Sequence, residues 1–272
     1  MRRVLHLILA LLLAGLLAVP AQAERLRMAV TTSFYNSGLS AVLLPEIKAD
    51  LGLEVELIVV GTGQALRLGE AGDVDAVLVH ARAAEDAFVA AGYGTHRREI
   101  MFNDFVIIGP VDDPAGVRGA DSAANAFARI ARAGARFVSR GDESGTHKRE
   151  KALWQAAQAE GGVAPDGPWY MVAGSGMGAT LNTAAGMGAY TLSDRASWLN
   201  FGNKAGLALL FSGDPALFNQ YAYIPVNPAR WPHVKAEAAA RLEAWLTSDR
   251  ARDLINGYRL NGEQLFTFNA QE

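Results

Sequence analysis

Hydrophobic positions along the chain fall into two patterns, short apolar runs and longer stretches with helical spacing. The first half predicts strands at 27–31, 53–60, 74–79 and 105–110 and helices at 37–49, 64–71 and 83–91. The second half predicts helices at 123–133, 148–159, 234–245 and 248–257, with short strands at 135–139, 170–172 and 189–191. Strands that alternate with helices indicate an α/β fold with mostly parallel sheets flanked by helices.

The polar, turn-rich segment 111–119 interrupts this alternation directly after an apolar strand. We expect the chain to cross there into a second lobe and to return to the first after the strand that begins at 189. Lobe one would then comprise residues 24–109 plus 196–272, and lobe two residues 110–195. Two crossings between lobes leave a cleft where the carboxyl ends of strands meet, and open α/β sheets bind ligands in such places.

Residues 1–23 have the composition of a secretion signal peptide. Arg2 and Arg3 precede an apolar run that ends at Val19, and a small-residue cleavage site ends at Ala23. The run is shorter than the roughly 20 residues of a membrane span. We therefore expect cleavage after Ala23 and a periplasmic protein that is not stably held in the membrane; an uncleaved anchor is the alternative.

Charge and composition exclude several classes of partner. Removal of residues 1–23 takes away two arginines and no acidic residue, which leaves 23 basic and 28 acidic residues and a formal charge of −5. Such a chain has no electrostatic footprint for nucleic acid. It contains no cysteine and therefore no disulfide framework. Its histidines lack metal-binding spacing and no nucleotide-binding glycine motif is complete, so we expect no metal cation and no cofactor.

The most informative segment is 139–147, which reads Ser-Arg-Gly-Asp-Glu-Ser-Gly-Thr-His. It joins a predicted strand to a predicted helix, whose first amides point outward with partial positive charge. Arg140 and the hydroxyls of Ser144 and Thr146 beside such amides predict a site for a small tetrahedral oxyanion. Gly145 would let the backbone approach the ligand, and Asp142 would fix the orientation of the arginine.

Further candidates follow the other predicted strands and would face the same cleft. They are Thr31, Thr32 and Ser33 after the first strand, Thr62 after the second and His80 after the third. Helix capping would explain any one of these loops alone. The loops 31–33, 61–63 and 140–146, the last of which contains an arginine, together favour binding.

A hydrolase is the competing interpretation from another class, because His147 follows Ser144 by three residues. No orienting acid or nucleophile elbow accompanies the pair, so we do not expect an enzyme. A sensor domain whose closed lobes dock on a signalling partner is a further alternative.

The segments 31–33, 103–110, 137–148, 176–182 and 189–195 together resemble the substrate-binding proteins of bacterial ABC importers for oxyanions, above all their tungstate-binding branch. The resemblance implies a two-lobed type II periplasmic binding fold with its cleft at a two-strand hinge. It implies capture of tungstate, or molybdate, for the membrane subunits of an ABC importer, and a monomer by analogy. It carries over seven anion contacts, which are Thr32, Ser33, Thr62, Arg140, Ser144, Gly145 and Thr146. From the residues themselves we expect Thr31, His80 and Asp142 in supporting positions.

Phosphate-binding relatives share the loop pattern that residues 140–146 show, and they place an aspartate near the end of the third strand. The comparable residues of this chain, 77–81, include no aspartate. Tungstate, molybdate and sulfate are fully deprotonated and present only acceptors. A pocket of donors alone would leave the proton of hydrogen phosphate unpaired, at a cost of about 1–3 kcal/mol. A phosphate or sulfate receptor of the same fold stays open as the alternative. The bulky pair Phe34-Tyr35 departs from the family pattern beside the first loop.

Overall fold

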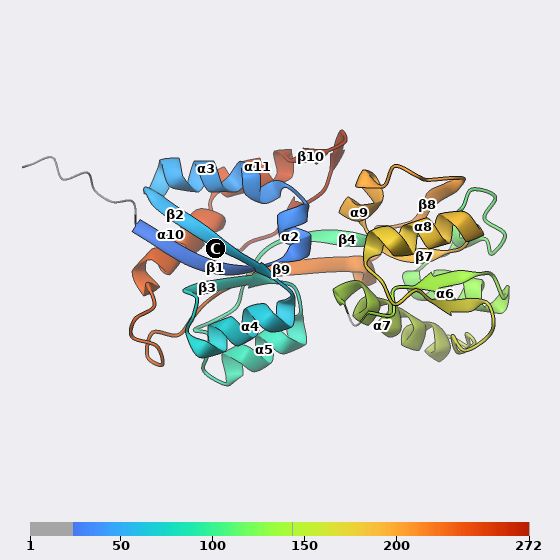
Figure 1. Cartoon of the computed structure of the whole chain (residues 1–272), viewed down its shortest axis with the longest axis horizontal. Coiled ribbons are helices and arrows are strands. Elements are labelled where there is room, and N and C mark those ends of the chain that lie inside the picture. Colours follow the sequence, from blue (N-terminus) through green and yellow to red (C-terminus); the bar gives the residue numbers. More distant parts are fainter. Residues whose placement is uncertain (1–23, 143, 272) are drawn as a thin grey trace, which may run out of the picture.

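The computed structural model describes residues 24–142 and 144–271. Its elements form two groups, which the long strands β4 and β9 connect (Figure 1). The predicted signal peptide, residues 1–23, lies outside the described residues. Within the described ranges, no helix is long and apolar enough to cross a membrane.

Parallel strands form one side of the first group. β1 (Glu24–Thr31) lies between β2 (Leu53–Val60) and β3 (Ala76–Val79) and pairs in parallel with both. The connecting helices are α3 (Leu39–Leu51), α4 (Thr62–Ala71) and α5 (Arg82–Ala90). Because the strands are parallel and in register, their carboxyl ends meet at one edge of the sheet, with Thr31 opposite Val60. The loops that carry the predicted hydroxyls and His80 start at this edge.

The rest of this sheet is antiparallel, so the prediction of mostly parallel sheets is wrong on this point. β9 (Phe218–Pro225) lies between β3 and β4 (Arg98–Pro110) and runs opposite to both. β12 (Thr267–Phe268) also pairs antiparallel with β4. The sheet is mixed because the chain returns from the second group directly as a strand, whereas a parallel neighbour needs a crossover helix.

β4 is a 13-residue strand that serves both groups. It pairs with β9 as far as Asp104, opposite Phe218, and from Phe105 onward with β7 (Thr191–Asp194). Its end also pairs with β8 (Leu207–Phe211). Only 105–110 was predicted as a strand, because the preceding residues are mixed polar and apolar. The change of partner at 104–105 marks the crossing between the groups.

The second group contains the parallel pair β5 (Phe137–Ser139) and β6 (Tyr170–Val172). Its helices are α6 (Ala123–Arg132), α7 (Gly145–Ala159), α8 (Met177–Met187) and α9 (Arg195–Asn200). The remaining elements are α2 (Thr32–Asn36), α10 (Ala236–Leu246), α11 (Asp249–Gly257), β10 (Arg259–Leu260), β11 (Glu263–Gln264) and the 3-10 turns η1 (Val117–Gly119) and η2 (Pro215–Leu217). In the first group, α10 and α11 pack on α3.

Each group has its own buried core. In the first, Tyr221, Tyr223 and Phe266 are the largest fully buried side chains. In the second, the ring of Trp154 meets the rings of Phe127 and Phe137 edge to face, with centroids 4.4 and 5.0 Å apart. Separate cores let each group keep its internal structure while the connecting strands bend.

Candidate functional site

A cavity of about 340 Å³ lies between the two groups at the carboxyl edge of β1 and β3. It brings together all seven predicted contact residues, although they are up to 114 positions apart in the sequence, from Thr32 to Thr146. The predicted supporting residues Thr31 and His80 also line it. The first group contributes the residues of three loops, and the second group contributes those of the loop after β5 and the start of α7.

Ser33 is the centre of a hydroxyl network in the first wall. Its Oγ lies 3.0 Å from Oγ1 of Thr31, 3.0 Å from Nε2 of His80 and 3.1 Å from the hydroxyl of Tyr221. Thr31 is buried and caps α2 by accepting a hydrogen bond from the amide of Phe34. The capping interpretation therefore holds for Thr31, whereas Thr32 beside it is exposed to the cavity.

Neither His80 nor Tyr221 brings charge to this wall at neutral pH. Burial, with a smaller effect of the nearby Arg149 charge, lowers the pKa of His80 to about 4. Burial raises the pKa of Tyr221 to about 12. Both groups thus remain neutral hydrogen-bonding partners of Ser33.

Arg140 has one strong partner, one weak one and one unused donor. Its Nη2 donates to Oδ2 of Asp142 at 2.5 Å, and its Nη1 lies 3.5 Å from Oγ1 of Thr146. Its Nε is buried and has no hydrogen-bond partner among the described residues. A buried guanidinium donor without a partner is costly, and this one belongs to a residue that lines the cavity.

Asp142 bonds to both the arginine and the loop backbone. Its Oδ1 accepts from the amide of Ser144 at 3.2 Å. Burial opposes its ionisation, but the bonds from Ser144 and the charge of Arg140 outweigh burial and lower the pKa of Asp142. The carboxylate is therefore ionised and cancels the arginine charge locally.

α7 begins at the cavity, three residues earlier than predicted. The Oγ of Ser144 caps it by accepting from the amide of His147 at 3.2 Å. The amides of Gly145 and Thr146 belong to the first turn, which leaves them available to a ligand. A Cβ added to Gly145 would lie 3.2 Å from Cε1 of His80, so this turn is packed closely against the opposite wall.

Gly141 allows the loop its sharp turn. Its φ is +63°, and an added Cβ would lie 2.1 Å from Cγ1 of Val172. A side chain at this position would be strained and would also clash with β6. Glycine is therefore needed here for both backbone conformation and space.

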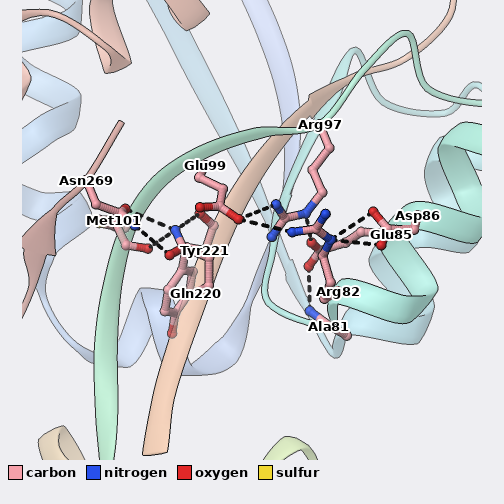
Figure 2. Close-up of polar contacts among 10 residues, drawn as sticks. All are labelled: Ala81, Arg82, Glu85, Asp86, Arg97, Glu99, Met101, Gln220, Tyr221 and Asn269. Carbon is pink, nitrogen blue, oxygen red and sulfur yellow. Dashed lines mark hydrogen bonds and ion pairs between the residues drawn. The ribbon is translucent and has the colours of Figure 1, made fainter. Parts of the chain in front are cut away.

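A buried ion-pair network supports the turn after β3 (Figure 2). The amide of Ala81 donates to Oε1 of Glu85 at 2.5 Å, and Arg97 Nε donates to Oε2 of Glu85 at 2.6 Å. Arg97 also reaches Glu99 at 2.7 Å. The side chain of Glu85 is fully buried and that of Arg97 is 9% exposed. This network, which was not predicted from the sequence, fixes the backbone immediately after His80.

Several residues of the cavity wall were not predicted from the sequence. Phe105, Lys148, Asp194 and Asn219 line the cavity. Asn219 lies on β9, a strand that was not predicted although half of its residues are aromatic or β-branched. Asp194 lies at the start of α9, whose cap it forms by accepting from the amide of Ser197 at 2.8 Å.

A second cavity of about 440 Å³ adjoins the first and shares Thr32, Ser33, Arg140 and Asp194 with it. The two cavities are thus parts of one cleft. In the described part of the chain, no group of three or more histidine, aspartate or glutamate residues is placed to hold a metal ion.

Comparisons with known proteins identify the family of this chain. A family model described as the PBP superfamily domain matches residues 18–250. The tungstate-binding protein TupA of Peptoclostridium acidaminophilum is 44% identical over 247 residues, which cover 89% of this chain and 85% of the relative. The chain belongs to the TupA-like family of the PBP superfamily.

Solved structures of this family share the fold. The tungstate-binding protein TupA from Desulfovibrio alaskensis G20 is 48% identical and aligns with a TM-score of 0.88, over 92% of this chain and all of that chain. The structure titled as the tungstate ABC transporter from Geobacter sulfurreducens is 49% identical, with a TM-score of 0.75 over 86% and 99% of the two chains. This TupA-like chain is therefore an extracytoplasmic binding protein with an α/β periplasmic-binding fold, not an enzyme.

Proposed function

We propose that this protein captures tungstate and delivers it to the membrane subunits of an ABC importer. The observation that carries the proposal is the convergence of Arg140, the hydroxyl groups and the start of α7 on one cavity between two groups of elements. The guanidinium of Arg140 supports it, because Asp142 holds this group at the cavity and an oxyanion accepts charge-assisted hydrogen bonds from a guanidinium. The names of the relatives support tungstate as the anion.

The proposed contacts come from both sides of the cleft. Thr32, Ser33 and Thr62 would donate from the first group, and Arg140, Ser144, Gly145 and Thr146 from the second. Thr31, His80 and Asp142 would hold these donors in place through the bonds described above. An anion that bonds to both sides would stabilise a closed form of the cleft.

The proposed lobes are residues 24–109 plus 196–272 and residues 110–195, with β4 and β9 as the hinge. β8, although it comes from the segment 196–272, pairs with the end of β4 and packs in the core of the second group. The proposal includes export by the signal peptide with cleavage after Ala23, a periplasmic location and a monomeric receptor.

A fully deprotonated dianion suits the cavity because hydroxyls, amides and a guanidinium supply most of its polar wall. Molybdate is nearly the same size as tungstate, so it belongs to the same proposal. Asp194 is the exception in this wall, because its carboxylate could accept the proton of hydrogen phosphate. A phosphate receptor is therefore the second candidate function.

Calorimetric titration of the mature protein with tungstate, molybdate, sulfate and phosphate tests the proposal. We expect tight one-to-one binding of tungstate that sulfate and phosphate do not displace. Tight phosphate binding that disappears in Asp194→Asn would favour the second candidate instead. Asparagine can still cap α9, so this variant removes the carboxylate charge with little change to the helix.

A further inference from the structure

The charges that line the cleft do not by themselves favour a dianion. Arg140 is paired with Asp142 at 2.5 Å, so the two charges largely cancel. Asp194 adds a negative charge to the wall. Lys148 also lines the cavity, but it is exposed and its charge is screened by solvent. A further positive charge close to the cleft would therefore add to the attraction that the hydroxyls and the first amides of α7 exert on a doubly charged anion.

Arg149 lies directly behind this wall. It is half-buried on α7, with its Cζ 6.0 Å from the ring centroid of Phe105, a residue of the cavity wall. Its Nη2 donates to the carbonyl oxygen of Phe218 at 3.1 Å. Among the described residues, no carboxylate lies within ion-pair distance of its guanidinium. This side chain is thus anchored to both connecting strands and keeps its charge uncompensated.

The field of this charge reaches the cavity. Burial lowers the pKa of Arg149 itself, which shows the cost of holding the cation without a counter-ion. Its positive charge also contributes to the low pKa of His80, a residue of the opposite wall. Apolar matter such as the Phe105 ring screens a charge much less than water does.

We propose that Arg149 is a specificity-determining residue that supplies the uncompensated positive charge for the bound dianion without contacting it. This inference rests on the proposed function. In the empty protein the half-buried cation is destabilising, and in the complex the anion becomes its counter-ion. Arg140 then provides directed hydrogen bonds, and Arg149 provides charge that favours a dianion over a monoanion of similar shape.

Charge-changing variants test this role by calorimetry with tungstate at low and at physiological ionic strength. We expect Arg149→Gln to raise the Kd about tenfold or more, which corresponds to about 1.4 kcal/mol. Arg149→Lys keeps the charge and should stay within about threefold of the wild type. Arg129→Gln is the matched control, because Arg129 is also half-buried and its hydrogen-bond partners among the described residues, Asn125 and the Gly116 carbonyl, are uncharged.

Unchanged tungstate affinity in Arg149→Gln would overturn the inference, as would equal losses in the Gln and Lys variants. If Arg149→Gln does not fold, Arg149→Met takes its place under the same criteria. Absence of tungstate binding in the wild type would instead overturn the proposed function, and the inference with it.

Thermal unfolding provides a readout that a purely structural role would not give. We expect Arg149→Met to unfold at the same or a higher temperature than the wild type without ligand, and to gain less from added tungstate. A lower melting temperature with an unchanged gain from tungstate would show that Arg149 only supports the fold.

Discussion

Replacement of Arg140 by alanine should weaken tungstate binding more than any other single change at the proposed site. The side chain is 16% exposed and is held by Asp142 at 2.5 Å, and its buried Nε has no partner in the part of the chain that the structure describes. Its removal therefore takes away oriented donors that are already in place before the ligand arrives. It also leaves Asp142 as an uncompensated negative charge beside the anion.

These two effects set the size of the loss. Hydrogen bonds to charged groups contribute about 1.5–3 kcal/mol. Repulsion between the unpaired carboxylate of Asp142 and the bound anion adds to that amount. We expect a total loss of about 2–4 kcal/mol, or roughly 30- to 1,000-fold in Kd. The loss should be smaller in Arg140→Ala combined with Asp142→Asn, because the second change removes the repulsion.

Calorimetry of the wild type, both single variants and the double variant measures these terms. Urea unfolding without ligand is the control for loss of structure, and we expect a change below about 1 kcal/mol because the Arg140–Asp142 pair lies in a loop. Binding by Arg140→Ala within twofold of the wild type would refute the site. If the double variant binds tungstate more weakly than Arg140→Ala does, Asp142 does not repel the anion in the single variant.

Three further predictions concern the structure around the site. Gly141→Ala should cost about 1–3 kcal/mol of stability and should weaken tungstate binding. Gly174 is the control, because its φ of +61° is similar but no described atom lies within 4 Å of an added Cβ, so Gly174→Ala should retain binding. Urea unfolding and calorimetry distinguish the two variants. His80 has a pKa of about 4 in the folded protein, so the unfolded chain binds a proton near pH 6.5 that the native protein does not. The contribution of neutral His80 to the free energy of unfolding is therefore complete above pH 6.5 and is lost as the pH falls toward 4, by up to about 3 kcal/mol. Urea unfolding of the wild type at several pH values should show this loss, and His80→Gln should not. Glu85→Gln should destabilise the protein by about 3 kcal/mol because it leaves the buried Arg97 with a weaker partner; Asp86→Asn, in the exposed pair with Arg82 (Figure 2), should cost less than about 1 kcal/mol in the same assay.

The sequence predicted the first half of the fold well because its strands and helices have clear periodicity. The strand 53–60 and the short strand 170–172 agree with the structure to the residue. β8 and β9 were missed, and with them the antiparallel half of the sheet. α8 was also missed, because its glycine- and alanine-rich sequence has weak helical periodicity. Pairing between strands distant in the sequence depends on tertiary contacts that periodicity does not contain.

The candidate site was predictable as far as it follows strand ends. The loops after β1, β2 and β3 meet because these parallel strands are in register and end at one edge of the sheet. The sequence shows both the strands and the polar residues that follow them. Asn219 and Asp194 escaped prediction because they reach the cavity from strands that run the other way. Arg149 was not predicted to act at the site because charged residues flank it in the sequence of a helix. Only the structure shows that its side chain contacts Phe105 and Phe218.

The position of β9 also determines when the chain can fold. This strand lies between β3 and β4 in the sheet, yet it begins only at residue 218. A shorter nascent chain leaves both neighbours with unpaired edges, and its first lobe cannot close. Contacts across such large sequence separations also make folding slow. A chain exported as proposed here would thus remain unfolded until nearly all of it has been synthesised, which is the state in which a polypeptide can be threaded through a membrane channel.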